Sequence, residues 1–186
     1  MSDLREEKIH TIRYAEGQAR LGGTVFLIFG VLGALVSAPN LTSAVPLLIF
    51  YGTLVVNTYF SIRCFGAITR PGDRSQKIAD GILVVLYLLL ALSFANALIF
   101  VALAILLFKV STIKYILLST TVEFPSHKRL LRRKIYINAT GTLLCVFALG
   151  GIFLGYGMVA LWSWTLVFVI ANIYLLIVNP LYVLND

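Results

Sequence analysis

Residues 21–64 have the sequence LGGTVFLIFGVLGALVSAPNLTSAVPLLIFYGTLVVNTYFSIRC, an apolar run broken near its middle by SAPN at residues 37–40. A helix rises about 1.5 Å per residue and the hydrocarbon core of a bilayer is about 30 Å thick, so about 20 residues make one crossing. The run is therefore long enough for two crossings. It predicts a transmembrane helical hairpin that turns near residues 37–40.

Two more apolar runs of double length follow, at residues 78–122 and 135–184, and each must fold back, near residues 93–97 and 155–157. Polar connections separate the runs: RPGDRSQK at residues 70–77 and EFPSHKRLLRRK at 123–134. Pro and Gly in such stretches favour turns. The sequence predicts an all-α polytopic membrane protein with six transmembrane helices as three hairpins. They cover about 21–68, 78–122 and 135–184, after an amphipathic segment at residues 1–20.

The composition supports this class. Of the 186 residues, 60% are hydrophobic and only 12% are charged, and the mean hydropathy is +0.94. A soluble domain averages about 25% charged residues. The chain is therefore expected to form one compact membrane domain with no room for a separate soluble module.

The positive charges are distributed unevenly along the chain. All fifteen Lys and Arg lie in the N-terminal segment, in the two polar connections or in the adjoining helix ends, and the three short turns carry no charge. This is the positive-inside pattern of membrane proteins. It predicts that both termini and both long connections face the cytoplasm (N-in/C-in). Because membrane orientation explains where the positive charges lie, the net charge of +7 indicates no nucleic-acid partner.

The first and third hairpins share a pattern, G-T-x4-F-x3-G, at residues 23–33 and 141–151. The second helices share a short Asn-x-Tyr, at residues 57–59 and 172–174, and the middle hairpin fits only loosely. Small residues four apart let helices approach closely in lipid. The matches predict a helical hairpin repeat.

Polar residues inside the apolar runs are expected to pair within each hairpin, because an unsatisfied polar group in hydrocarbon costs several kcal/mol. Counting from the outer turns places Asn57 opposite Gly23 and Thr24, and Asn172 opposite Thr142. In the middle hairpin, the same count places Asp80 level with Ser111 and about a turn from Lys109 and Lys114. These pairs would fix the helix register.

Lys109 is the deepest charge in the apolar runs, with Lys114 a turn and a half further on. A lysine inside a span is a functional candidate by default. Alternatively, its stem extends to the membrane surface or its ammonium pairs with Asp80. Arg63 lies nearer the surface, where the same extension is expected.

Residues 127–134, HKRLLRRK, form the most basic stretch of the chain. Basic residues near a bilayer attract anionic lipid headgroups at about 1 kcal/mol each. This predicts an anionic-lipid face that comprises Lys128, Arg129, Arg132, Arg133 and Lys134. Trp162 and Trp164 are expected in the aromatic belt at the outer end of the last span.

The sequence gives no support for an enzyme. Both histidines, His10 and His127, lie outside the predicted spans, and there is no HExxH, no Ser-His-Asp set and no Gly-rich phosphate loop. We therefore expect no catalytic residues, no metal site and no cofactor. The absence of an acidic residue near the bilayer midplane also argues against proton-coupled transport.

The first hairpin resembles the repeat of the HdeD-like acid-resistance membrane proteins. The resemblance is carried by Gly22, Gly23, Gly30, Gly33 and Pro39, and the third hairpin retains Gly141, Gly150 and Gly151. Members of that family are six-span proteins built from three hairpins. The resemblance implies a stress-related inner-membrane protein without known catalytic residues.

Three functions are compatible with these features. The first is a non-enzymatic accessory or scaffold subunit of a membrane complex, or a homo-oligomer. The second is a small-molecule transporter or substrate-binding membrane subunit, with a polar site near Asn57, Lys109 and Asn172 that Tyr59 and Tyr174 would also line. The third is lipid handling through the basic face.

Overall fold

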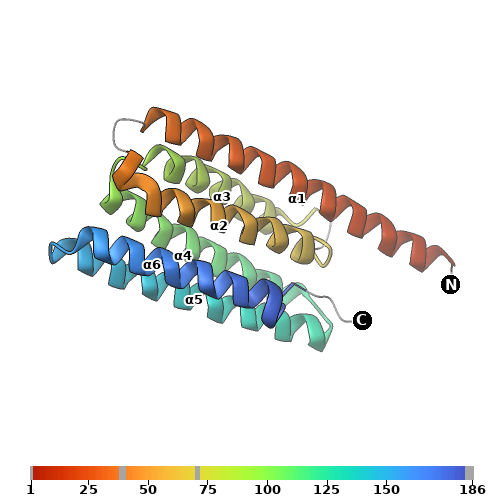
Figure 1. Ribbon diagram of the computed structural model, residues 1–186. Helices are drawn as coiled ribbons and strands as arrows, with labels where there is room; N and C mark the ends of the chain where they lie inside the picture. Colours follow the sequence, from red (N-terminus) through yellow and green to blue (C-terminus); the bar gives the residue numbers. More distant parts are fainter. Residues whose placement is uncertain (1, 38–40, 70–71, 183–186) are drawn as a thin grey trace.

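The computed structural model describes residues 2–37, 41–69 and 72–182, and its regular elements are all helices (Figure 1). The helices are α1 (Ser2–Val36), α2 (Leu41–Gly66), α3 (Arg74–Leu92), α4 (Ala97–Thr121), α5 (Pro125–Phe153) and α6 (Gly157–Ile173). A single π-helical turn, η2 (Tyr174–Val178), continues α6. The predicted all-α fold of three helical hairpins is confirmed.

All six helices are long and apolar enough to cross a membrane. The candidate spans are Arg13–Val36, Ala44–Gly66, Arg74–Leu92, Ala97–Thr121, Pro125–Phe153 and Gly157–Val178. Large apolar side chains, such as Leu35, Val85 and Leu143, are exposed on the outside of the bundle. Exposed apolar side chains on every side are what contact with lipid tails requires. The chain is a polytopic membrane protein.

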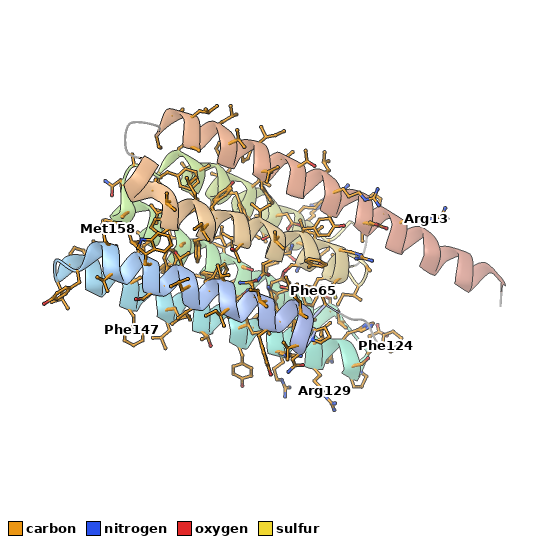
Figure 2. All side chains as sticks on the ribbon, viewed as in Figure 1. Arg13, Phe65, Phe124, Arg129, Phe147 and Met158 are labelled. Carbon is orange, nitrogen blue, oxygen red and sulfur yellow. The ribbon has the colours of Figure 1, made fainter. Side chains whose placement is uncertain are left out.

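The helices pack as a closed ring. Besides the three hairpin pairs, α1 contacts α3, α4 contacts α5, and α6 contacts α2, while α2 and α4 touch only sparingly across the middle. Both chain ends lie at the end of the bundle where α2 and α4 finish and α3 and α5 begin, which we call the terminal end (Figure 1). Figure 2 shows Arg13 and Arg129 toward this end and Met158 at the opposite end.

Local chemistry explains several helix ends. The Asp73 carboxylate accepts hydrogen bonds from the backbone N–H groups of Ser75 and Gln76, at 2.9 and 3.3 Å, and so caps α3. The Ser75 hydroxyl donates to the same carboxylate oxygen, and together with the backbone bonds it holds the pKa of Asp73 below its usual value. Asn96 caps α4 through the Ile99 N–H, and Pro125 occupies the first turn of α5, where no N–H partner is needed.

Two helix boundaries differ from those expected. α1 is continuous from Ser2 to Val36, so no helix end separates residues 2–20 from the first span. α5 begins at Pro125, ahead of residue 135, where the third apolar run starts. The basic stretch at residues 127–134 is therefore part of a transmembrane helix, and each of its side chains has a fixed direction around that helix.

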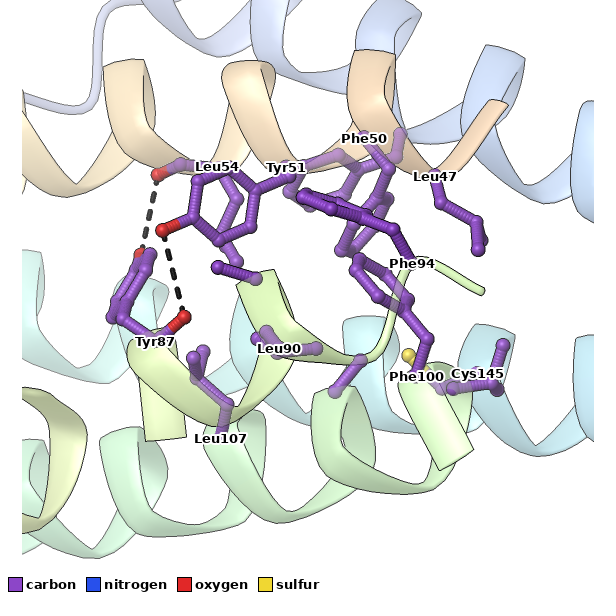
Figure 3. Packing of buried hydrophobic residues seen from close by; sticks show 14 of the residues in the cluster. Leu47, Phe50, Tyr51, Leu54, Tyr87, Leu90, Phe94, Phe100, Leu107 and Cys145 are labelled. Carbon is purple, nitrogen blue, oxygen red and sulfur yellow. Dashed lines mark hydrogen bonds between the residues drawn. The ribbon is translucent and has the colours of Figure 1, made fainter. Parts of the chain in front are cut away.

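Aromatic side chains fill the half of the bundle farther from the terminal end. Phe50 of α2 stacks on Trp164 of α6 with ring centroids 3.9 Å apart, and both rings lie against Phe100 of α4. The expectation that Trp164 belongs to an interfacial belt is wrong, because its ring is only 4% exposed. Beside this group, Tyr51 and Tyr87 donate their hydroxyls to backbone carbonyls of neighbouring helices (Figure 3). Aromatic packing of this kind closes the interior at that level.

The shared glycine pattern does not produce the same packing in the two hairpins. A methyl group on Gly33 would lie 2.1 Å from the carbonyl oxygen of Ala91, so α1 and α3 touch backbone to backbone there. A methyl group on the matching Gly151 would instead meet the Cβ of Ala160, at 2.6 Å, within its own hairpin. Both contacts require a small residue, but they join different pairs of helices.

Candidate functional site

A cavity of about 1020 Å³ occupies the half of the bundle nearer the terminal end. Side chains from all six helices line it, and neither Phe50 nor Trp164 is among the lining residues. Phe108 and Phe168, which pack against Phe50, form part of the wall. Most of the wall is apolar. The uncharged polar side chains of the wall that come from α2 to α6 and from η2 are Asn57, Thr58, Ser61, Gln76, Tyr87, Ser111, Tyr115, Tyr136, Asn138, Thr140, Asn172 and Tyr174.

Lys134 of α5 is the buried cation of this wall. Its side chain is only 3% exposed, and its ammonium donates to Asn57 Oδ1 at 2.9 Å and to the Tyr182 hydroxyl at 2.7 Å. The ammonium also lies 5.1 Å from the ring centroid of Tyr182 and 5.8 Å from that of Tyr115. Oxygen lone pairs and ring faces both favour a positive charge. These contacts stabilise the ammonium form of Lys134, while burial away from water acts against it.

Hydrogen bonds join Lys134 to residues of two other helices and of the C-terminal segment. Asn57 of α2 donates its amide N–H to Asn172 Oδ1 of α6, and Asn172 in turn donates to the Phe168 carbonyl at 2.8 Å. The Tyr182 hydroxyl donates to Asn57 Oδ1 and accepts from the Ser61 hydroxyl at 3.0 Å. We call Asn57, Ser61, Lys134, Asn172 and Tyr182 the polar cluster. Its members converge from four separate segments of the chain.

The sequence analysis assigned Lys134 to the anionic-lipid face, and the structure contradicts this. The buried positions of α5 recur at intervals of three or four residues, which is the spacing of one helical face. They are Leu131, Lys134, Asn138, Gly141, Cys145 and Ala148. Because α5 begins before the basic stretch, Lys134 falls on this inner face.

The remaining basic residues of that stretch lie outside the core. Lys128, Arg129 and Arg132 are exposed, and Arg133 donates from its guanidinium to the Asn179 carbonyl at 2.9 Å. Arg133 thus helps to hold the C-terminal segment that carries Tyr182. The three exposed side chains keep the position that contact with lipid headgroups requires.

A second set of polar contacts lines the cavity between α3, α4 and α5. Asn138 donates to the Ser111 hydroxyl at 2.9 Å, and Gln76 donates to the Lys114 carbonyl at 3.2 Å. The Lys114 ammonium forms an ion pair with Asp80. The other amide atom of Gln76, Oε1, is buried and has no hydrogen-bond partner in the structure.

The polar pairs expected for Asn57 and Asn172 within their own hairpins are replaced by a pair between hairpins. In the middle hairpin, by contrast, Asp80 pairs with Lys114 of the same hairpin. Asn57 bonds to Asn172 of the third hairpin, whereas Thr142 bonds to the Asn138 carbonyl of its own helix. Ser111 bonds to Asn138 rather than lying against Asp80. The physical reason is the ring arrangement, which brings α2 against α6 and α4 against α5.

The other residues that the sequence analysis named as site candidates lie partly at the cavity and partly on the outside of the bundle. Lys109 is exposed on α4 and is not among the residues that line the cavity, and Arg63 is also exposed. Asp80, Lys114 and Tyr174 do line the cavity. Tyr59 packs over Gly23, whose added Cβ would lie 3.5 Å from its ring. The polar site expected near Asn57, Lys109 and Asn172 thus has two of these three residues at the cavity.

Sequence reasoning overlooked Ser61, Gln76, Tyr115, Asn138 and Tyr182. Helical spacing carried a signal for some of them, since Asn57 and Ser61 continue the buried series of Phe50 and Leu54 on α2. Tyr182 had no such signal, because it follows Pro180, where the last helix has ended. Leu181, fully buried, anchors the segment that presents Tyr182 to the cluster.

Among the described side chains, no group of three or more His, Cys, Asp or Glu is placed to hold a metal ion. Comparison of the chain with protein-family models, with curated proteins and with solved structures finds no match.

Proposed function

We propose that this polytopic membrane protein binds a small molecule in the cavity, as a solute-binding membrane subunit or as a transporter. The observation that supports the proposal is the polar cluster at the wall of a cavity of about 1020 Å³. Ligand pockets measure about 300–1,000 Å³ and combine an apolar wall with a few placed polar groups. In lipid, polar groups of this kind are costly unless they are paired or serve a ligand or ion.

The position of the cavity favours binding from one side. Its lining includes Thr69, Gly72 and Asp73, from the connection between α2 and α3 at the terminal end. At the other end the stacked rings of Phe50 and Trp164 occupy the interior. A solute would therefore enter from the terminal end, and a transport cycle would need the aromatic half to open.

The proposed role is binding rather than catalysis. In the polar cluster, the amide and hydroxyl groups of Asn57, Asn172 and Tyr182 are engaged in holding one another and Lys134 in place. Such mutual bonding fixes the side-chain directions of a recognition site.

Native mass spectrometry of the protein purified from its own membranes tests the proposal. We expect a bound small molecule, which Leu144→Trp should displace because Leu144 lines the cavity. The matched control is Leu143→Trp on the same helix, since Leu143 is 54% exposed and faces outward. Recovery of no small molecule, or equal recovery from both variants, would contradict the proposal.

A second proposal is an accessory or scaffold subunit, or a homo-oligomer. It is supported by α1, whose first turns extend beyond the other helices at the terminal end (Figure 1). A stress-related role, as the resemblance to HdeD-like proteins implies, belongs to the same proposal. A lone monomer in detergent, together with pull-downs from native membranes that recover no partner, would count against it.

We also propose that the terminal end faces the cytoplasm, where Lys128, Arg129 and Arg132 would contact anionic lipid headgroups. The exposure of these three side chains at the start of α5 supports this placement. Their joint replacement by Gln should abolish any stabilisation of the protein by anionic over neutral lipid. An unchanged preference would rule out this face as the lipid contact.

A further inference from the structure

The charge at the cavity wall points to the class of molecule that binds there. This inference rests on the proposed function. We infer that the ligand carries a carboxylate, that this carboxylate accepts a hydrogen bond from Lys134, and that an apolar body occupies the deeper part of the cavity.

Lys134 brings a positive charge into the bundle without an acidic neighbour. Its described hydrogen-bond partners, Asn57 and Tyr182, are neutral. The two acidic residues that line the cavity are committed elsewhere, because Asp73 caps α3 and Asp80 pairs with Lys114. A buried charge without a counter-ion carries a large desolvation cost, and an anionic ligand would remove it.

The geometry leaves room for such a bond. A lysine ammonium has three N–H groups, and the hydrogen bonds described for Lys134 use two of them. The third is available to a ligand oxygen. The flanking rings of Tyr115 and Tyr182 shield the site from water, which strengthens a charge-assisted hydrogen bond.

Of the three lysines that line the cavity, Lys114 pairs with Asp80 and Lys77 is exposed. This leaves Lys134 as the buried ammonium without an acidic partner among the described side chains. One such ammonium indicates a single negative charge. Phosphate groups are usually held by several cationic or N–H donors, whereas a carboxylate is balanced by one lysine. The apolar part of the cavity wall includes Phe108, Leu144 and Phe168. Such a wall suits an alkyl or aromatic body.

Gln76 provides a second and independent sign that the cavity holds an occupant. Its side chain is 2% exposed and lines the cavity, and its Oε1 atom lacks a partner. Buried acceptors without a hydrogen bond are rare in native proteins. An occupant with an N–H or O–H group near α3 would satisfy this atom.

The test uses the full-length protein in nanodiscs of neutral phosphatidylcholine, so that no anionic lipid competes. Isothermal titration compares phenylacetate with phenylacetamide, and decanoate with decanamide. Phenethylamine and phenyl phosphate extend the first pair to a cation and to a phosphate. The phenylacetate arm represents a water-soluble acid and the decanoate arm represents a fatty acid from the membrane.

We expect at least one of the two carboxylates to bind, at least tenfold more tightly than its amide. Lys134→Met should weaken that carboxylate at least tenfold and leave the amide unchanged. Lys128→Met, the same substitution at an exposed position of α5, should change neither. Lys134→Arg, which keeps the charge, should keep the preference for the acid. The comparison of acid with amide on the unsubstituted protein stands even if a Lys134 variant fails to fold.

The inference is overturned if neither carboxylate binds, if either amide matches its acid, or if phenyl phosphate is preferred. It is also overturned if Lys134→Met keeps the affinity for the acid. If native mass spectrometry still recovers a neutral or cationic molecule that Leu144→Trp displaces, the proposed function stands and only the carboxylate inference fails. The absence of any displaceable molecule would instead count against the proposed function.

Discussion

The ammonium of Lys134 and the hydroxyl oxygen of Tyr182 lie 2.7 Å apart, although 48 residues separate them in the chain. This contact ties the start of α5 to the segment that follows the last helix. It also positions Tyr182 to donate to Asn57, so one phenol links three parts of the polar cluster. The C-terminal segment is thus a structural part of the cavity wall.

Tyr182→Phe should lower the thermal stability of the protein in detergent. The substitution keeps the ring but removes a hydroxyl that accepts from Lys134 and donates to Asn57. A buried polar group left unsatisfied costs about 1–3 kcal/mol. Tyr156→Phe is the control, because Tyr156 is 68% exposed at the opposite end of the bundle. Equal melting temperatures for the two variants would show that the hydroxyl of Tyr182 contributes nothing.

Asn57 and Asn172 should be coupled energetically across the two hairpins. In a double-mutant cycle of Asn57→Leu and Asn172→Leu, we expect a coupling free energy of about 0.5–1 kcal/mol, as measured for polar pairs in helical membrane proteins. Reversible unfolding in mixed micelles gives the four stabilities. Asn57→Leu combined with Thr112→Val should be additive, because Thr112 bonds only to the Phe108 carbonyl of its own helix among the described contacts. A coupling near zero for the two asparagines would argue that they do not pair.

Gly33→Ala should destabilise the protein by about 1–3 kcal/mol, the usual cost of overpacking. The added methyl would lie 2.1 Å from the Ala91 carbonyl oxygen, so α1 and α3 would have to separate. Gly17→Ala, in the same helix, meets nothing within 4 Å and should raise stability by up to about 1 kcal/mol through helix propensity. Melting temperatures measured in one detergent compare the two. A stable Gly33→Ala protein would mean that the two helices are not in close contact there.

The proposed orientation can be tested with single cysteines at the two ends of the bundle. In intact cells, a membrane-impermeant maleimide should label Tyr156→Cys, in the turn between α5 and α6, and should miss Ser126→Cys at the start of α5. Permeabilisation should expose Ser126→Cys. The native Cys64 and Cys145 are buried, so the unsubstituted protein gives the background. Labelling of Ser126→Cys in intact cells would reverse the orientation.

Local sequence was sufficient for the membrane class and for the three hairpins. The break at residues 37–40, the Asn96 cap and the Gly155 turn are short-range features that begin or end helices wherever they occur. Prediction was wrong at Lys134 because it treated residues 127–134 as a polar connection. Had the start of α5 been placed at Pro125, helical spacing would have put Lys134 on the same face as Asn138.

The sequence by itself determined that the chain lies in a bilayer as three hairpins, because span length and the placement of charge depend only on neighbouring residues. Tertiary structure alone decided that α2 lies against α6, that Asn57 meets Asn172, and that Tyr182 closes on Lys134. These contacts join residues far apart in the chain. Their choice depends on how side chains such as Phe50 and Trp164 fit together between helices, and no single hairpin carries that information.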